Sequence, residues 1–421
     1  MKILVVGGGG REHALCWKIN KSPLVEKIYC APGNAGISKV AECIDIEVSD
    51  LEGLKDFAIK NGIDLTVVGP ELPLTLGIVD LFEQNNKKIF GPDKAASELE
   101  GSKAFSKTLM KDHSIPTADY ETFTDLNDAL KWIKEINGPF VVKADGLAAG
   151  KGVIICNSVK EGESALQSII VDKTFGNAGN KVVIEEFLHG EEASIFVLTD
   201  GDKYLILEPS QDHKAIYDND KGPNTGGMGA YCPAPVVTED LLRKVEKQII
   251  VPTIQGLNSE GIKYRGVLYI GLMINNGEVK VLEYNCRFGD PETQPVLMKL
   301  VSDIVPIFME IAEGALKTDT LTWKGGSSIC VVMSSKGYPG SYEKGVELSK
   351  LNKLDESEDV VLFHAGTKFK SDKTVTNGGR VLGLTVFDKS ISSAIEKVYK
   401  NISKIDDGTL YYRTDIGEKA I

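Results

Sequence analysis

The sequence has little arginine, little histidine and no long apolar run. Six of its 421 residues are arginine, and no two of the five histidines have the spacing of a metal site. No stretch approaches the roughly 18 consecutive apolar residues that cross a bilayer, so we expect no membrane-spanning segment. Residues 1–6, apolar except for Lys2, are too few for the core of a secretory signal and lead directly into glycines.

Cysteine gives no sign of a disulfide framework or of a zinc site. The seven cysteines are odd in number, and no two of them form a Cys-x-x-Cys pair. We interpret them as reduced thiols, and we therefore expect a cytoplasmic protein.

Positive charge is in deficit. Lys and Arg total 48 against 60 for Asp and Glu, which gives a formal net charge of −12. This argues against non-specific binding to nucleic acids or membrane surfaces, which needs excess positive charge. A local basic pocket for a small anion is still allowed. Arg11, Arg287 and Arg380 lie in glycine-containing loops, where a planar guanidinium can bind two oxygens of an anion.

The pattern of apolar segments predicts several domains of mixed α/β and α+β class. Strands and helices alternate through residues 1–101, which is typical of a doubly wound domain with a parallel sheet. One of these helices is predicted to begin at a Ser49-x-x-Glu52 capping box. Residues 102–325 begin with a linking helix and contain a subdomain at about 116–188. Residues 326–421 have short strands, turns and one helix, and predict a small β-rich domain.

Two glycine-rich segments indicate anion binding. Gly7–Gly10 follow the first strand, but Glu12 stands where a dinucleotide fingerprint needs glycine, so no NAD site is expected. A tight turn and an anion held at the helix N-terminus both remain open. Gly146–Gly152 join two strands as a hairpin and do not match a Walker loop. Lys143 beside this hairpin is suited to gripping nucleotide phosphates, with a flexible loop as the alternative.

Acidic and amide side chains cluster near residue 285. Glu283 and Asn285 lie two apart on a predicted strand, so they project from one face and offer hard oxygen ligands for Mg²⁺. A polar strand edge is the alternative. Arg287 follows with two acids, and its alternatives are an anion clamp or a salt bridge to Asp290 or Glu292. The acids of residues 185–192, taken alone, are interpreted as solvated.

Nine segments occur in one order along the whole chain and together resemble a known family. They are GGREHAL at 9–15, APGNAG at 31–36, VGPE at 68–71, LEGSK at 99–103, KADGLAAGKG at 143–152, QDHK at 211–214, GPNTGGMG at 222–229, NCRFGDPETQ at 285–294 and TNGGRV at 376–381. The resemblance is to the ATP-grasp superfamily and, within it, to the phosphoribosylamine–glycine ligase family (glycinamide ribonucleotide synthetases).

This resemblance implies an activity. Members of the family join glycine to 5-phosphoribosylamine with ATP, giving glycinamide ribonucleotide, ADP and phosphate through a glycyl phosphate, in de novo purine biosynthesis. It implies ATP as co-substrate, Mg²⁺ or Mn²⁺ as metal, small molecules as the partners, and a monomer. It also implies that residues 116–188 form a lid subdomain of an ATP-grasp domain pair.

The resemblance further implies which residues form the site. Lys143 and Arg287 are the expected catalytic residues, and Glu283 and Asn285 are the expected metal ligands. ATP would contact Lys103, Lys143, Gly146, Gly150, Lys151, Gly152, Glu185, Glu186, Phe187, Leu188 and Glu192. The other substrates would contact Gly8, Gly9, Gly10, Asn34, Glu71, Asp212, Lys214, Thr225, Gly226, Gly227, Arg287, Asp290 and Glu292.

Two other functions remain as hypotheses at this stage. One is an ATP-grasp ligase for a different carboxylate and amine. The other is a nucleotide-binding sensor without catalysis, which is disfavoured because Lys143, Glu283 and Asn285 are all present. Dependence of ADP release on both glycine and ribosylamine separates the three.

Overall fold

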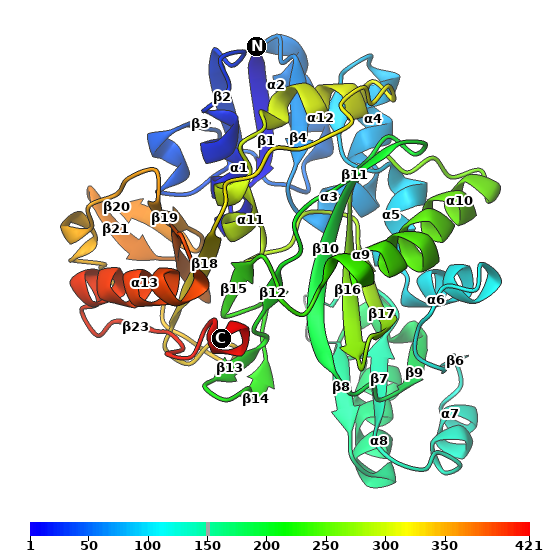
Figure 1. Ribbon diagram of the computed structural model, residues 1–421. Coiled ribbons are helices and arrows are strands. Elements are labelled where there is room, and N and C mark those ends of the chain that lie inside the picture. The colour runs from blue at the N-terminus through cyan, green and yellow to red at the C-terminus, as the bar shows by residue number, and fades with distance from the viewer. Residues whose placement is uncertain (149–151) are drawn as a thin grey trace.

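The N-terminal region is a doubly wound domain. The computed structural model describes residues 1–148 and 152–421. The elements of this region are β1 (Lys2–Gly7), α1 (Gly10–Ile19), β2 (Lys27–Pro32), β3 (Glu42–Cys43), α2 (Leu51–Lys60), β4 (Leu65–Val68), α3 (Glu71–Leu76), α4 (Ile78–Gln84), β5 (Ile89–Phe90) and α5 (Lys94–Gly101). The strands are parallel in the order β3-β2-β1-β4-β5, which confirms the predicted fold class (Figure 1).

Alternate side chains of β1 enter two different cores. Ile3 and Val5 pack on the face covered by α1, whereas Leu4 and Val6 pack on the face covered by α2 and α4. All four are fully buried, as expected for a central parallel strand with helices on both faces. One local prediction is wrong: Asp50, not Ser49, caps α2 by accepting a hydrogen bond from Gly53 N at 2.9 Å.

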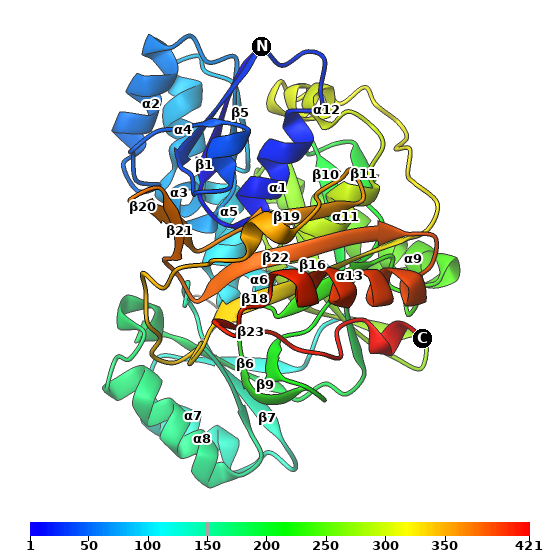
Figure 2. The same cartoon turned by 90° about the vertical axis from the view of Figure 1, so that its left-hand side faces the viewer.

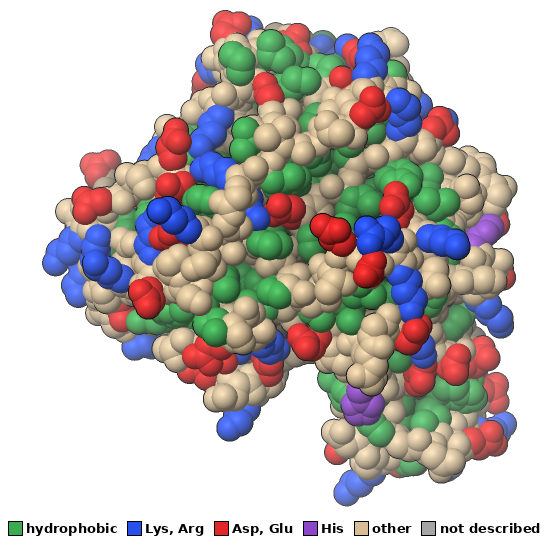
Figure 3. All heavy atoms as spheres, viewed as in Figure 1, with side chains coloured by type: hydrophobic (Ala, Val, Ile, Leu, Met, Phe, Trp, Pro, Cys, Tyr) green, Lys and Arg blue, Asp and Glu red, His purple; other side chains and the backbone are tan. Residues whose placement is uncertain are grey.

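The next part of the chain forms a separate lobe. It contains β6 (Tyr120–Phe123), α7 (Leu126–Ile133), β7 (Phe140–Ala144), β8 (Val153–Cys156), α8 (Val159–Leu166) and β9 (Val182–Glu186). The preceding helix α6 (Lys103–Asp112) lies outside the lobe, because its Leu109 and Met110 pack in the same core as α5. After α6, an antiparallel sheet in the order β6-β9-β7-β8 packs against α7 and α8. The β7–β8 pairing is the predicted hairpin. In the space-filling view this lobe projects from the body beside a notch (Figure 3).

A second antiparallel sheet forms the centre of the molecule. It is built from β10 (Glu191–Thr199), β11 (Tyr204–Ile206), β16 (Gly266–Asn275) and β17 (Glu278–Asn285), in the order β11-β10-β16-β17. The helices α9 (Glu239–Val245) and α10 (Val251–Ser259) cover one face, while α11 (Thr293–Lys299) and α12 (Ile304–Ala312) follow in the chain. β16 and β17 form a hairpin that turns at Asn276-Gly277, and β17, which carries Glu283 and Asn285, is the edge strand of the sheet.

The C-terminal sheet crosses the predicted domain boundary at residue 325. Its members are β12 (Gln211–Asp212), β15 (Gly229–Cys232), β18 (Ser327–Ser335), β19 (Val360–His364), β22 (Arg380–Asp388) and β23 (Leu410–Tyr411), and two of these precede the boundary. The long helix α13 (Ile391–Ile405) packs along β18 and β22 (Figure 2). Two small hairpins complete the region: β13 (Ala215–Tyr217) with β14 (Lys221–Asn224), and β20 (Thr367–Lys370) with β21 (Lys373–Thr376).

Of the helices in the described ranges, none combines the length and the apolar character that crossing a bilayer requires.

Buried histidines lie where the C-terminal region meets its neighbours. The backbone N–H of His364 donates to Nδ1 of His13 at 2.8 Å, which joins β19 to α1. Burial, the nearby His364 and Lys39 lower the pKa of His13 to about 3, and burial and Lys39 lower that of His364 to about 3. Burial and Arg413 lower the pKa of His213 to about 4.

These histidines predict acid lability. Their folded-state pKa values lie below the unfolded value of about 6.5, so their contribution to stability is complete above pH 6.5 and is lost as the pH falls toward 3. Within that window, each histidine lowers the free energy of unfolding by about 1.4 kcal/mol for every unit by which the pH falls. We expect the melting temperature to fall from pH 6.5 to 4.5, with a shallower fall for His364→Gln. Parallel pH profiles of parent and variant would contradict this assignment.

Candidate active site

One cleft collects most of the predicted site residues. It has a volume of about 490 Å³ and is lined by all three regions of the chain. Seven cations line it, namely Arg11, Lys103, Lys107, Lys143, Lys214, Arg287 and Arg380. Nine acids line it as well, namely Glu71, Glu100, Glu185, Glu186, Glu192, Asp212, Glu283, Asp290 and Glu292. The cations include the three arginines that the sequence singled out in glycine-containing loops. A cleft of this size with convergent cations is suited to an anionic ligand as large as a nucleotide.

One end of the cleft is apolar. Val141 and Ile155 from the β7–β8 hairpin line it, together with Phe187 and Leu188 after β9 and Met273 of β16. Flat aromatic groups bind well between such side chains, and the backbone of the segment after β9 lies beside them.

Lys143 lies at the boundary between the apolar end and the charged part. Its Nζ is 2.8 Å from Glu185 Oε1 and donates to the carbonyl of Leu282 at 3.3 Å. Lys107 Nζ is 3.0 Å from the other carboxylate oxygen of Glu185. Burial lowers the pKa of Lys107 to about 8, although Glu185 opposes that shift. The buried Glu185 therefore balances two lysines, and one of its effects is to orient Lys143 in the cleft.

The predicted metal ligands lie together on β17. Glu283 pairs with Gly271 and Asn285 with Tyr269 of β16, and both side chains reach the cleft. A Cβ at position 271 would lie 3.3 Å from Glu283 Cγ, so glycine there leaves room for the carboxylate. Burial raises the pKa of Glu283, but Lys214, Lys143 and Lys103 outweigh this and lower it overall. An ionised carboxylate beside an amide is a donor set that fits a hard divalent cation.

Lys214 contacts two acids of the cleft. Its Nζ is 2.8 Å from Glu192 Oε2 and 3.8 Å from Glu283 Oε1. These acids and Asp212 raise the pKa of Lys214 well above its ordinary value, although burial opposes them. The lysine is therefore charged, and it screens the repulsion between Glu192 and Glu283.

Arg287 has partners that differ from those considered from the sequence. Its Nε is 3.2 Å from Glu71 Oε2, and its Nη2 is 2.9 Å from Glu100 Oε1. The loop acids Asp290 and Glu292 are not its ion-pair partners among the described residues. Glu100 also accepts a hydrogen bond from Cys286 N at 2.7 Å. Arg287 thus joins the end of β17 to the N-terminal domain while it lines the cleft.

The glycine loop after β1 is occupied by a side chain of its own helix. Glu12 Oε2 accepts a hydrogen bond from Gly9 N at 2.6 Å, so a carboxylate already caps the N-terminus of α1. A Cβ at Gly8 would lie 2.6 Å from Gly33 O, and one at Gly10 would lie 2.7 Å from Gln294 Nε2. Close approach of these loops explains the glycines, and a role in substrate binding stays a prediction.

Asn34 makes four hydrogen bonds to backbone groups. Its Nδ2 donates to the carbonyls of Gly8 and His364, and its Oδ1 accepts from the N–H groups of Gly36 and Ile37. This side chain joins the N-terminal loops to β19. Its contact with substrate stays a prediction.

The structure sorts the predicted site residues into three groups. Those that line the cleft are Glu71, Lys103, Lys143, Gly152, Glu185, Glu186, Phe187, Leu188, Glu192, Asp212, Lys214, Thr225, Gly226, Glu283, Asn285, Arg287, Asp290 and Glu292. Those described outside its lining are Gly8, Gly9, Gly10, Asn34, Gly146 and Gly227. Gly150 and Lys151 lie outside the described residues.

Sequence reasoning did not assign four charged residues of the cleft. They are Arg11, Glu100, Lys107 and Arg380. Arg11 and Arg380 had a signal, since both are arginines in glycine-containing loops. Lys107 lies one helical turn after Lys103, which is a signal that could have been used. Glu100 is identified through its long-range contact with Arg287.

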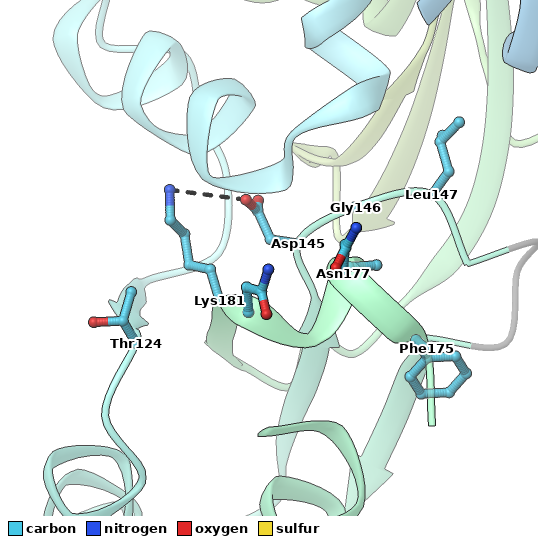
Figure 4. Close-up of a pocket in the computed structure, with 9 residues that line it drawn as sticks. Thr124, Asp145, Gly146, Leu147, Phe175, Asn177 and Lys181 are labelled. Carbon is cyan, nitrogen blue, oxygen red and sulfur yellow. Dashed lines mark ion pairs between the residues drawn. The ribbon is translucent and has the colours of Figure 1, made fainter. Parts of the chain in front are cut away.

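A second, more open hollow lies beside the loop that joins β7 to β8 (Figure 4). It has a volume of about 610 Å³, and Lys181 and Asp145 form an ion pair of 3.8 Å in it. Asp145 Oδ1 also accepts a hydrogen bond from Ala104 N at 2.7 Å, which ties the hairpin to α6. Lys181 is the one Lys or Arg among its described lining residues, so the cleft with seven cations is the better candidate for an anionic ligand.

Comparisons with known proteins cover the whole chain. Family models described as the phosphoribosylglycinamide synthetase N domain, ATP-grasp (A) domain and C domain match residues 1–100, 101–293 and 328–419. A phosphoribosylamine–glycine ligase of Caldanaerobacter subterraneus subsp. tengcongensis is 49% identical over 416 residues, which cover 99% of each chain.

Two solved structures have a fold similar to that of this chain. The crystal structure of phosphoribosylamine–glycine ligase from Thermotoga maritima has a TM-score of 0.87 at 34% identity and covers 99% of this chain and 100% of that one. The biotin carboxylase domain of Hydrogenobacter thermophilus 2-oxoglutarate carboxylase, solved with MgADP, has a TM-score of 0.75 at 19% identity over 98% and 91% of the two chains. The second likeness concerns the fold alone.

Proposed function

The chain belongs to the phosphoribosylglycinamide synthetase family, and from this premise we propose how its cleft joins glycine to 5-phosphoribosylamine. Membership makes it an ATP-dependent carbon–nitrogen ligase of purine biosynthesis. The observation that carries the proposal is the convergence of Lys103, Lys143, Glu283 and Asn285 beside the apolar end of one cleft.

We assign the apolar end to adenine and the neighbouring cations to the triphosphate. Backbone groups of residues 185–188 would read the adenine edge, and Glu192 would bind the ribose hydroxyls. Lys103 and Lys143 would then contact the phosphates. Phosphoryl transfer needs positioning and charge neutralisation more than it needs a nucleophile on the protein, and these lysines supply both.

Glu283 and Asn285 would hold a divalent cation, Mg²⁺ or Mn²⁺. The ionised state of Glu283 and the amide oxygen beside it support this assignment. When bound, the metal would neutralise phosphate charge that otherwise repels an incoming carboxylate.

The reaction we propose has two steps. A carboxylate oxygen of glycine attacks the γ-phosphorus of ATP, and the bond from that phosphorus to the bridging oxygen of ADP breaks. The ribosylamine nitrogen then attacks the carbonyl carbon of the glycyl phosphate and loses a proton, and inorganic phosphate leaves with the C–O bonding electrons. Lys143 and Arg287 would stabilise the negative charge on the transferred phosphoryl group.

The metal assignment predicts the behaviour of Glu283→Gln. The variant keeps the side-chain shape but loses the charged ligand, so the half-saturating Mg²⁺ concentration should rise at least tenfold while the melting temperature changes little. The measurement is the initial rate against metal concentration. Glu278→Gln is the matched control, because Glu278 lies on the same strand with an exposed side chain that pairs with Lys244. An unchanged half-saturating concentration in Glu283→Gln would exclude this residue as a ligand.

The proposed function is tested by ADP release from the purified protein. We expect rapid ADP formation with glycine and ribosylamine together and little with either omitted. Formation with another carboxylate and amine would indicate a ligase of different specificity. Nucleotide binding without any ADP release would indicate the sensor.

We also propose that the enzyme acts as a monomer in the cytoplasm. All seven cysteines are free thiols, and six of them are buried, which supports a reducing compartment.

A further inference from the structure

A small hairpin and its flanking residues supply part of the lining of the cleft. The segment 212–226 contains β13 and β14 and supplies Asp212, Lys214, Asn224, Thr225 and Gly226 to the lining. The residues of β14 are exposed, and Tyr217 of β13 is 53% exposed. Ala215 and Ile216 of β13 are buried, and Ile216 packs in the core of the C-terminal region, but the rest of the hairpin has little apolar contact to fix its position.

The C-terminal segment binds this hairpin through one buried arginine. Arg413 is 1% exposed, and its Nη1 donates to the carbonyl of Ala215 and to Asp220 Oδ1, both at 3.0 Å. Its Nε and Nη2 donate to the two oxygens of Asp415 at 2.8 and 2.7 Å. Two hydrogen bonds from one guanidinium thus join the hairpin to the end of the chain, and two more hold the guanidinium in place within the C-terminal segment.

Neighbouring contacts reinforce the turn of the hairpin. Asn219 and Asp220 have φ angles of 59° and 52°, which non-glycine residues adopt at some cost in energy. Asn219 N donates to Asp415 Oδ2 at 2.8 Å, and Lys419 Nζ is 2.5 Å from Asp220 Oδ2. The C-terminal segment therefore stabilises a turn conformation that the hairpin alone would hold weakly.

Arg413 is connected to the lining of the cleft through Ala215 and its neighbour Lys214. Its acceptor Ala215 directly follows Lys214, whose carbonyl accepts two hydrogen bonds at 2.8 Å, from the N–H and from Oγ1 of Thr225. A shift of the Ala215 carbonyl therefore moves both cleft-lining residues. Arg413 itself is not among the residues that line the cleft.

We infer that Arg413 is a positioning residue of the ligase: it fixes the β13–β14 hairpin to the C-terminal segment and so sets the place of Lys214 and Thr225 in the cleft. This inference rests on the function proposed above. A lysine is not equivalent at this position, because its single nitrogen cannot serve two carboxylates and a carbonyl in one plane. Small displacements of groups that orient substrate are costly, on the order of 10²-fold in rate for about 1 Å.

The test compares Arg413→Lys and Asp220→Asn with the parent. We expect kcat/KM for ribosylamine to fall about tenfold or more in Arg413→Lys and less in Asp220→Asn, with the KM for ATP within about threefold of the parent. Amide hydrogen exchange at Thr225 should accelerate in both. Val398→Ala, in the core of the C-terminal region, is the control for a general loss of stability, and it should keep the parental kcat/KM once the rates are corrected for the folded fraction.

Two results would overturn the inference. One is kinetic constants equal to those of the parent in both variants. The other is a loss of activity that follows only the unfolded fraction, as in Val398→Ala. If Arg413→Lys does not fold, Asp220→Asn decides alone, since Asp220 is partly exposed at the surface end of the contact. Failure of the proposed function is distinguishable, because the parent itself would then lack glycine-dependent ADP release.

Discussion

Replacing Lys143 by Met is expected to lower turnover by on the order of 10²–10³-fold, the usual cost of removing one group that stabilises transferring charge. The methionine keeps the aliphatic stem and deletes the ammonium group. Glu185 would keep its 3.0 Å contact with Lys107, so the loss of Lys143 does not leave a buried carboxylate unpaired. The measurement is kcat at saturating ATP, glycine and ribosylamine.

Lys181→Met is the matched control for that experiment. Lys181 belongs to the same lobe and pairs with Asp145 at 3.8 Å, but it lines the second hollow and not the cleft. Its variant should keep parental turnover. Unchanged turnover and unchanged ATP affinity in Lys143→Met would contradict the role of Lys143 in phosphate binding.

Arg287→Lys is expected to reduce ligase activity by on the order of 10²-fold. The arginine reaches Glu71 of α3 and Glu100 of α5 through separate nitrogens, whereas lysine can satisfy only one of them well. The positive charge is retained, so the protein should fold, with a lower melting temperature because Glu100 loses its close partner. Activity at saturating substrates and thermal unfolding are measured together.

Arg265→Lys is the matched control for an effect that arises only from weaker contact between the domains. Arg265 also joins the central region to the N-terminal domain, through Glu83 at 3.3 Å, but outside the cleft. We expect this control to keep its activity. Near-parental activity of Arg287→Lys would show that Arg287 is a structural link between the regions and has no part in the reaction.

Local sequence patterns predicted the elements that carry the site. Two apolar strands with glycines between them predicted the β7–β8 hairpin, and Asn276-Gly277 at the turn between β16 and β17 is a dipeptide typical of such turns. Period-two alternation then placed Glu283 and Asn285 on one face. These predictions succeeded because the responsible forces act within a few residues of each other.

Long-range contacts could not be predicted in the same way. The partners of Arg287 are 187 and 216 residues away (287 − 100 and 287 − 71), and both come from helices of another domain. Glu12 fills the glycine loop through a local bond, but its burial depends on Gly69 from a different strand end. The two strands that extend the C-terminal sheet, β12 and β15, have two and four residues, too few for a clear pattern, and β15 is placed by its pairing with β18. Contacts between residues far apart in the sequence therefore determine the Arg287 ion pairs, the burial of Glu12 and the pairing of these two strands.

The choice between Ser49 and Asp50 as the cap of α2 illustrates a finer limit. Both residues are good N-caps, and Glu52 favoured Ser49 through the capping-box spacing. The backbone enters the helix one residue later, where Asp50 accepts from Gly53 N. Helix boundaries shift by one residue at almost no energetic cost when adjacent residues can both cap.

Transfer of an oxygen atom from glycine to phosphate tests the proposed glycyl phosphate route most directly. Glycine labelled with ¹⁸O in its carboxylate is incubated with the protein, ATP, ribosylamine and Mg²⁺, and the inorganic phosphate is analysed by mass spectrometry. If glycyl phosphate forms in the cleft, each phosphate released carries one oxygen from glycine, so the label appears in phosphate in step with the ligation product. Release of unlabelled phosphate alongside the product would contradict an acyl phosphate route.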